Sequence, residues 1–418
     1  MQRMKYLAAV ATVVAAASCY ADEAGAEPSP YRMDASNQAG WWKPIEEWNG
    51  SIYLAYDAWG SPTDGDADDT HTVYVARRSP DGTWVRGPLP YTGPNRYRDD
   101  IGHRQPSIAI DGAGHIHVFA SMHWDSWRYF RSSRPGDPMS MVDRSASMPS
   151  GSITYPNATR AANGDVYVIA RDGGCVGRLY RWALDTRRWS RLTFASDPNF
   201  CVYPDDVIPD PDGSVHIAWE WAYLGANGLR HLGSHVRYDP VANIFFDAAG
   251  VALRGPASTA TASVIYAPEE PGESRFARSS PSNPAGLQSA KLALDPSGRP
   301  VVAYRTRPTG GRFAVRFAEW NGIGWVRSVV YAGTYTTYAA VDVTFTSDRA
   351  PRVYYAKTAT LTGTQAHAAT RSLDGTWVER QLLPKVRVER LAVIRRSGVD
   401  YAYLSVPSAR RLHLEMVR

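Results

Sequence analysis

Residues 107–119 carry the pattern that decides the fold, and they read Ser-Ile-Ala-Ile-Asp-Gly-Ala-Gly-His-Ile-His-Val-Phe. Two short apolar runs lie on either side of the turn at 111–114, an arrangement that is typical of a tight β-hairpin. The second run, 115–119, alternates polar and apolar residues, as a strand with two different faces does. The stretch therefore predicts a pair of antiparallel strands.

The same unit recurs along the chain, and this repetition is the strongest signal in the sequence. Turns of similar composition stand at 163–165, 210–213 and 295–298. Seven copies of about 57 residues each account for the chain that follows the leader. The copies begin at Ser51, Ser107, Ala158, Val207, Lys291, Val341 and Leu391.

A seven-bladed β-propeller, in which small antiparallel sheets surround a central channel, explains this spacing. A β-sandwich of similar length would not produce so regular a recurrence. No shift in composition marks a domain boundary, so residues 22–418 are expected to form one all-β domain. Because the last copy ends close to Arg418, we expect the N-terminal segment around Trp41 and Trp42 to complete its sheet.

The composition supports a globular, turn-rich β protein. The chain has 418 residues, of which 44% are hydrophobic and 21% charged, with 34 Gly, 29 Pro, 14 Trp and 24 Tyr. Lys plus Arg number 46 against 41 Asp plus Glu, which gives a net charge of +5. The basic residues are scattered along the chain, so we expect no nucleic-acid partner.

Residues 1–21 have the pattern of a secretory signal peptide, with basic residues ahead of an apolar run at 7–17. Cleavage after Ala21 or after Ala26 fits the small residues found there, and a lipid anchor at Cys19 is the alternative. No later segment has the roughly 18 uninterrupted apolar residues of a membrane-spanning helix. We therefore expect a secreted or periplasmic protein without a transmembrane segment.

Two cysteines remain after the leader, Cys175 and Cys201. In an oxidising compartment a disulfide between them is favoured, and it would contribute about 3 kcal/mol by closing its loop. A zinc site that adds His231 or His235 is the alternative. The acidic run 64–69 lacks the glycine and the terminal glutamate of a calcium loop at the required spacing, so no metal site is expected there.

Propeller geometry brings together residues of neighbouring copies. In each blade, the residue before the innermost strand and the residue after the second strand emerge on the same face. Titratable and aromatic side chains occupy these positions in the second to fifth copies. They are His103 and His123, Tyr155 and Arg171, Tyr203 with the segment 220–223, and Arg305.

Several histidines and charged side chains have a structural explanation that involves no substrate. His117 and His216 lie inside strands and are expected to be core histidines that bond to their neighbours. Arg171 ends an apolar strand, where an unpaired charge is costly. It therefore needs either a bound anion or a structural carboxylate, for which Asp57 and Asp172 are the candidates.

One part of the chain resembles a known family. The stretch 99–111, Asp-Asp-Ile-Gly-His-Arg-Gln-Pro-Ser-Ile-Ala-Ile-Asp, together with His123, resembles the BNR-4-type (neuraminidase-like repeat) propellers that include the ulvan lyases. Residues 127–133 and 154–156 fit the same pattern, and the resemblance is strongest over 95–240.

The resemblance implies an active site without a cofactor. A second active-site tyrosine corresponds to Tyr203 or Tyr223, and these two with Arg305 are the expected substrate-binding residues. The residues in the positions of the catalytic groups are His103, His123, Tyr155 and Arg171.

These residues suit β-elimination from a 4-linked uronate. Arginine bound to the carboxylate stabilises the enolate, and tyrosine or histidine removes the C5 proton. We therefore expect a secreted, monomeric polysaccharide lyase that cleaves an acidic rhamnose-uronate polymer such as ulvan. One alternative is a glycoside hydrolase resembling α-L-rhamnosidases, which would usually need two facing carboxylates. The other is a non-catalytic carbohydrate-binding propeller.

Overall fold

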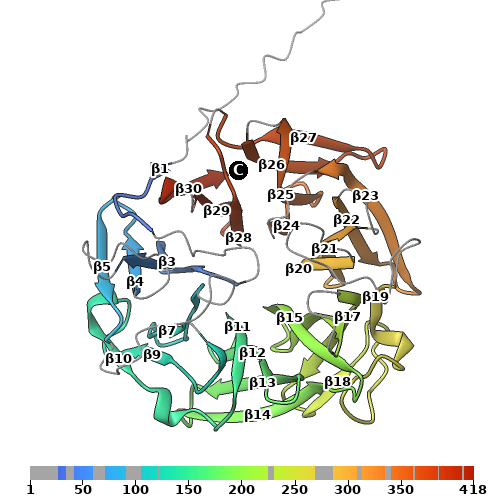
Figure 1. Cartoon of the computed structure of the whole chain (residues 1–418), viewed down its shortest axis with the longest axis horizontal. Coiled ribbons are helices and arrows are strands. Elements are labelled where there is room, and N and C mark those ends of the chain that lie inside the picture. Colours follow the sequence, from blue (N-terminus) through green and yellow to red (C-terminus); the bar gives the residue numbers. More distant parts are fainter. Residues whose placement is uncertain are drawn as a thin grey trace, which may run out of the picture.

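The computed structural model shows a ring of small β-sheets around a central channel (Figure 1). It describes residues 27–33, 42–59, 71–90, 105–120, 122–224, 230–268, 286–307, 313–334, 340–360, 363–384, 386–406 and 409–418. The described strands form seven blades of a single domain, so the predicted all-β seven-bladed β-propeller is confirmed. The expected signal peptide, 1–21, lies outside the described residues.

The first three blades follow the chain from the channel outward. Blade 1 consists of β2 (Ile45–Trp48), β3 (Ser51–Trp59), β4 (His71–Arg78) and β5 (Trp84–Pro88). Blade 2 consists of β6 (Ser107–Ile110), β7 (Ile116–Phe119), β9 (Tyr129–Ser132) and β10 (Met141–Asp143). Blade 3 consists of β11 (Ile153–Arg160), β12 (Val166–Asp172), β13 (Val176–Ala183) and β14 (Arg188–Ala195), with the short β8 (His123–Asp125) paired to β11.

Blades 4 and 5 share one sheet, because β17 and β20 form a short parallel pair. Blade 4 consists of β15 (Phe200–Pro209), β16 (Val215–Tyr223) and β17 (Arg230–Asp239), with β18 (Ile244–Phe246) and β19 (Ile265–Ala267) on β17. Blade 5 consists of β20 (Gly286–Leu294), β21 (Pro300–Arg307), β22 (Phe313–Trp320) and β23 (Trp325–Thr334).

The last two blades close the ring. Blade 6 consists of β24 (Val341–Phe345), β25 (Pro351–Thr360), β26 (Gly363–Arg371) and β27 (Trp377–Gln381). Blade 7 consists of β28 (Arg390–Arg396), β29 (Val399–Val406), β30 (Arg411–Val417) and β1 (Glu27–Pro28). The short 3₁₀ helices are η2 (Pro138–Ser140), η3 (Ser145–Ser147) and η4 (Ala262–Val264). Within the described residues, no helix is long and apolar enough to cross a membrane.

The blades pack face to face through apolar side chains. The second strand of blade 3, β12, is buried at every residue because its sheet is covered on both sides. Between blades 5 and 6, Val301 and Phe317 pack in one cluster with Val343 and Tyr355. Burial of such surfaces between sheets, at about 25 cal/mol per Å² of apolar area, is the main contribution to stability.

Hydrogen bonds tie the innermost strands of neighbouring blades together. Most of these strands belong to separate sheets, so single polar atoms bridge them instead of a continuous ladder. In each contact an oxygen on or just before one inner strand accepts a backbone N–H of the next inner strand. These pairs are Lys43 carbonyl with Ile108 at 3.0 Å, Ser107 Oγ with Ala158 at 2.9 Å, Asp206 Oδ2 with Leu292 at 2.9 Å, and Asp342 Oδ2 with Val393 at 2.6 Å.

An N-terminal strand completes the last sheet, but a different segment supplies it than we expected. Strand β1 pairs with β30 as Glu27 with Leu414 and Pro28 with His413 (Figure 1). Trp42 instead lies buried beside the channel, and Trp41 is outside the described residues. The first blade also begins earlier than predicted, since Ser51 starts its second strand and Ile45 its innermost strand.

Asp342 makes the stability of the inner ring depend on pH. Burial, and then the charge of Asp206, raise its pKa from 3.8 to about 7. Between about pH 4 and 7 the folded protein therefore holds a proton that the unfolded chain releases, so this group lowers the free energy of unfolding as the pH rises.

We expect Asp342→Asn to remove this contribution, so that the free energy of unfolding falls less between about pH 4 and 7 than in the wild type. Urea unfolding across this pH range measures the free energy of unfolding at each pH. The slope against pH is compared, and not the free energy itself, because asparagine has one hydrogen-bond acceptor fewer than aspartate at every pH. Asp185→Asn, at an exposed turn, is the control and should keep the wild-type slope. An unchanged slope for Asp342→Asn would contradict the assignment.

Candidate active site

Charged residues occupy equivalent positions near the ends of the second strands of successive blades. Arg171 pairs with Thr154 of its inner strand, Glu220 with Tyr203, and Arg305 with Gln288. All three charged side chains are buried, with Arg171 only 3% exposed. Because the inner strands begin at this face, one position in the repeat repeatedly brings a charge to the same end of the propeller.

Arg171 lies among three aromatic rings. Its guanidinium carbon is 4.8 Å from the ring centre of Trp124, 4.8 Å from that of Tyr155 and 4.7 Å from that of Tyr203. The rings come from β8, β11 and β15, so the site spans blades 3 and 4. We call these four residues the Arg171 cluster.

The Arg171 cluster offers the guanidinium no carboxylate. Among the described residues, no acidic group lies within ion-pair distance of Arg171, and its buried Nε has no hydrogen-bond partner. The adjacent Asp172 accepts from Tyr180 at 3.3 Å and lies 3.6 Å from both Arg178 and Arg191. Cation–π contacts are weaker than charge-assisted hydrogen bonds. The geometry therefore leaves a buried cation able to bind an anion.

A break in the register of β11 directs Tyr155 toward Arg171. The pairing with β12 shifts between Thr154 and Asn157, and Tyr155 has a φ of 59°, in the left-handed region that non-glycine residues seldom adopt. Bulges of this kind re-aim side chains and are common beside active sites. The Tyr155 ring is 5.4 Å from that of Tyr203 and 5.6 Å from that of Trp42.

His123 begins β8 and pairs with Thr154, the residue before Tyr155. Its side chain is half-buried, and it lies on β8, the strand that also carries Trp124. The structure thus brings His123, Tyr155, Arg171 and Tyr203 to one region, as the sequence predicts. The second predicted histidine, His103, lies outside the described residues, as does the acidic run 64–69.

Two predicted substrate-binding residues have different surroundings. Tyr223 pairs with Phe200, three residues beyond Glu220 on β16, and its ring packs 4.4 Å from the Phe200 ring. Tyr203 is therefore the tyrosine that reaches Arg171. Arg305 is fully buried in blade 5, with its guanidinium carbon 4.3 Å from the ring centre of Phe313.

Sequence reasoning did not place Trp124 or Trp42 in the site, although Trp124 contacts Arg171 and Trp42 contacts Tyr155. The only signal for Trp124 is its place directly after His123. Trp42 stands ahead of the first inner strand, and its contact with blade 3 depends on closure of the ring.

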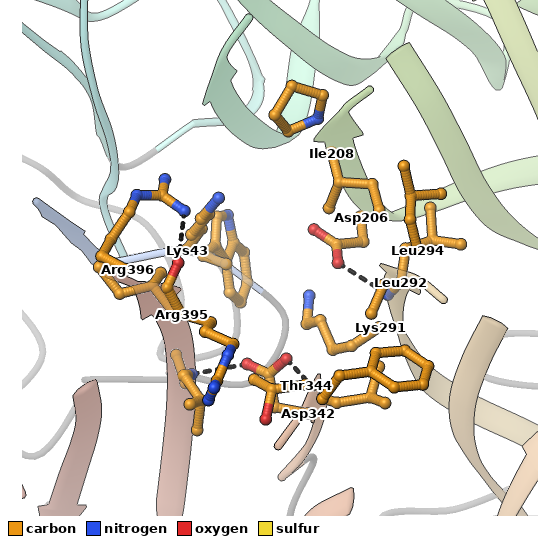
Figure 2. A pocket seen from close by; sticks show the side chains of 18 of the residues that line it. Lys43, Asp206, Ile208, Lys291, Leu292, Leu294, Asp342, Thr344, Arg395 and Arg396 are labelled. Carbon is orange, nitrogen blue, oxygen red and sulfur yellow. Dashed lines mark hydrogen bonds between the residues drawn. The ribbon is translucent and has the colours of Figure 1, made fainter. Parts of the chain in front are cut away.

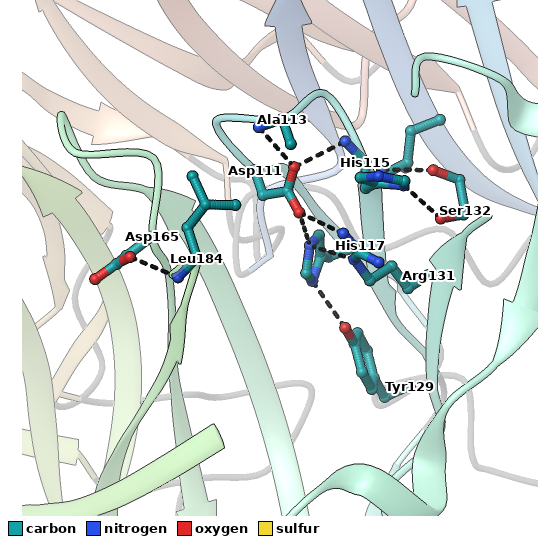
Figure 3. Close-up of polar contacts among 10 residues, drawn as sticks. Asp111, Ala113, His115, His117, Tyr129, Arg131, Ser132, Asp165 and Leu184 are labelled. Atoms are coloured by element: carbon teal, nitrogen blue, oxygen red, sulfur yellow. Dashed lines mark hydrogen bonds and ion pairs between the residues drawn. The ribbon is translucent and has the colours of Figure 1, made fainter. Parts of the chain in front are cut away.

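The Asp111 cluster is a separate polar network with a structural role (Figure 3). One oxygen of Asp111 accepts the N–H groups of Ala113 and His115 at 3.0 and 2.8 Å, which shapes the turn after β6. The other lies 3.1 Å from His117 Nε2 and 2.9 Å from Arg131 Nη2.

His117 is the core histidine that we predicted, since it also bonds the Tyr129 hydroxyl at 2.9 Å. Burial lowers its pKa to about 4. His216 repeats the arrangement in blade 4, with Asp210 at 3.2 Å and His235 at 2.9 Å. The expectation for both histidines is confirmed.

The disulfide expected between Cys175 and Cys201 is present. Both sulfurs are therefore committed, and His235 bonds His216 rather than a metal, so the zinc alternative is not supported. The side chain of His231 is outside the described residues.

A second charged region is the central cavity, of about 320 Å³ (Figure 2). The inner strands line it, and Lys43, Lys291, Asp206 and Asp342 face it. Both carboxylates already accept backbone N–H groups. The cavity extends toward the turns that end the inner strands, away from the strand starts where the Arg171 cluster lies.

The fold and the site together define a neuraminidase-like repeat propeller with a buried arginine at one face. The sequence model of the BNR repeat-containing family, BNR_4, matches residues 51–384, and the chain belongs to this family. No curated protein sequence matches the chain.

Among solved structures, the chain is similar to an ulvan lyase of polysaccharide lyase family PL25 bound to -[GlcA(1-4)Rha3S]-, with a TM-score of 0.67 and 17% identity over 93% of this chain and 95% of that one. It is also similar to the polysaccharide lyase Uly1, with a TM-score of 0.63 and 13% identity over 90% of each chain. At these identities the comparisons show a shared fold.

We expect Asp111→Ala to destabilise the fold by about 3 kcal/mol, because it leaves the buried His117, the partly buried Arg131 and two backbone N–H groups without their acceptor. Urea unfolding measures the loss. Asp295→Ala is the matched control in blade 5, where the equivalent turn aspartate pairs with the half-exposed Arg299 and should contribute less. Equal losses in the two variants would argue against a special role for the buried cluster.

Proposed function

We propose that the protein is a secreted polysaccharide lyase that cleaves a rhamnose-uronate polymer by β-elimination at a 4-linked uronate. The observation that carries the proposal is the buried Arg171, which has aromatic rings around it and no carboxylate partner among the described residues. A uronate carboxylate would supply the missing anion through charge-assisted hydrogen bonds.

Arg171 would assist the reaction as well as binding. Removal of the C5 proton moves negative charge onto the carboxylate, and a guanidinium already in place stabilises that enolate more than it stabilises the ground state. The low exposure of Arg171 keeps water away and strengthens this interaction.

Tyr155 and His123 are the groups positioned to exchange protons with the sugar. The guanidinium of Arg171 lies 4.8 Å from the centre of the Tyr155 ring, so the phenol would lie beside a uronate whose carboxylate Arg171 binds. His123 is on the strand that pairs with the start of β11, so both groups would address the same sugar. One would remove the C5 proton and the other would protonate the departing oxygen.

The fold comparison and the sequence support the substrate class. The PL25 ulvan lyase of the same fold was solved with a glucuronate-rhamnose-sulfate chain. The signal-like residues 1–21 and the disulfide support export, where such polymers are found.

Hydrolysis has less support in the site. Of the carboxylates on the strands of the site, Asp205 and Glu220 are 2% and 0% exposed, Asp172 is bonded to Tyr180, and Asp125 pairs with Arg128. Burial, and then the charges of Asp205 and Glu220, raise the pKa of Tyr266, so these two carboxylates lie near a buried phenol. A glycosidase needs two carboxylates that reach the scissile bond.

The test is an assay for the ultraviolet absorbance of the unsaturated uronate product, with ulvan first among several uronate polymers. We expect turnover by the wild type and a loss of about 100-fold or more in kcat for Arg171→Ala, because a transition-state charge partner is removed. Arg188→Ala, at an exposed position on the outer strand of the same blade, is the control and should keep its activity.

Other outcomes would replace the proposal. Release of free rhamnose without unsaturated product would make the protein a hydrolase. Binding of the polymer without any product would make it a carbohydrate-binding propeller, in which Arg171→Ala weakens affinity alone.

A further inference from the structure

Trp124 is the exposed aromatic member of the Arg171 cluster. It is 47% exposed, whereas Arg171 beneath it is 3% exposed. Among the tryptophans whose side chains are described, it alone is classed as exposed. An exposed indole beside a buried cation needs an explanation, because the fold gains nothing from leaving this surface in water.

The backbone holds Trp124 in a costly conformation. Its φ is 56°, in the left-handed region that bulky residues rarely adopt. The pairing of β8 with β11 is irregular between Ile153 and Thr154, and the buried Thr154 hydroxyl accepts the Trp124 N–H at 2.9 Å. Strain that the surroundings maintain in this way is concentrated at binding and catalytic sites.

Shielding of Arg171 does not account for this placement. Tyr155 and Tyr203 already lie within cation–π distance of the guanidinium, and both are more buried than Trp124. Part of the indole contacts Arg171, and about half of its surface remains available to a ligand.

We propose that Trp124 binds the pyranose ring of the uronate whose carboxylate Arg171 binds. This inference rests on the function proposed above. The carboxylate is one bond from the sugar ring, so a uronate that reaches Arg171 must place its ring beside Trp124. The C–H groups of a pyranose face pack well on an indole, which combines apolar area with a rigid plane.

Trp124 would thereby set the orientation of the sugar and help determine which sugar of the polymer occupies this position. His123 precedes it in the chain, and Tyr155 contacts the same guanidinium. A sugar ring held against Trp124 would present its C5 proton to these groups. Neutral rhamnose has no carboxylate for Arg171, so the pair selects the uronate for this position.

The experiment compares Trp124→Ala, Trp124→Leu and Trp124→Phe in the ultraviolet lyase assay, with kcat and KM determined separately. We expect KM to rise at least about tenfold in the Ala and Leu variants, as for removal of a main aromatic contact. The Phe variant, which keeps a flat ring, should recover most of the affinity, and kcat should change less than KM. Trp320→Ala, which removes a half-buried indole of blade 5, is the control and should leave both constants unchanged.

The variants separate the two proposals. A wild type that is active while Trp124→Ala and Trp124→Leu keep its KM would overturn the role of Trp124 and leave the lyase function standing. A Leu variant as good as the Phe variant would also overturn it, because bulk alone would then suffice. If Trp124→Ala fails to fold, the KM values of Trp124→Leu and Trp124→Phe still test the role of Trp124. A wild type that produces no unsaturated uronate from any polymer would overturn the lyase function and this inference with it.

Discussion

The hydrogen bonds between neighbouring inner strands are the contacts on which the rest of the structure depends. The oxygens of Ser107, Asp206 and Asp342 each accept a backbone N–H from the next blade, so the inner strands keep a set spacing around the channel. The Arg171 cluster takes its side chains from β8, β11, β12 and β15, and its geometry is therefore only as exact as this spacing. The pairing of β1 with β30 completes the ring that holds the spacing.

The polar groups of the molecule divide according to whether the fold already satisfies them. Asp111 is saturated by two backbone N–H groups, a histidine and an arginine, and the channel carboxylates are similarly engaged. Such groups stabilise the blades and have little capacity left for a ligand. Arg171 differs, because aromatic rings surround it without supplying the anion that a buried guanidinium favours. That contrast is why we assign the chemistry to Arg171 and not to the more conspicuous histidine clusters.

Sequence reasoning succeeded where the repeat is regular and failed where it is interrupted. The inner strands of blades 2, 4 and 5 end in a four-residue turn of the Asp-x-x-Gly type, and those blades were located correctly. The first inner strand, which ends at the two-residue turn Asn49-Gly50, was missed, and the blade was predicted to begin at Ser51, directly after that turn. Tyr203 and Tyr223 could not be separated by spacing, because the contact of Tyr203 with Arg171 forms between blades 4 and 3 and depends on how they pack.

The sequence by itself determined the number and order of the blades, because strand periodicity and turn residues act over a few neighbours in the chain. It also determined which residues lie at the ends of the strands, and hence that His123, Tyr155 and Arg171 share a face. The tertiary structure alone decided that Trp124 contacts Arg171, that Trp42 contacts Tyr155, and that Asp172 pairs with other arginines. These contacts depend on bulges, on positive φ values and on the closure of the ring, and each of these arises from packing between segments far apart in the chain.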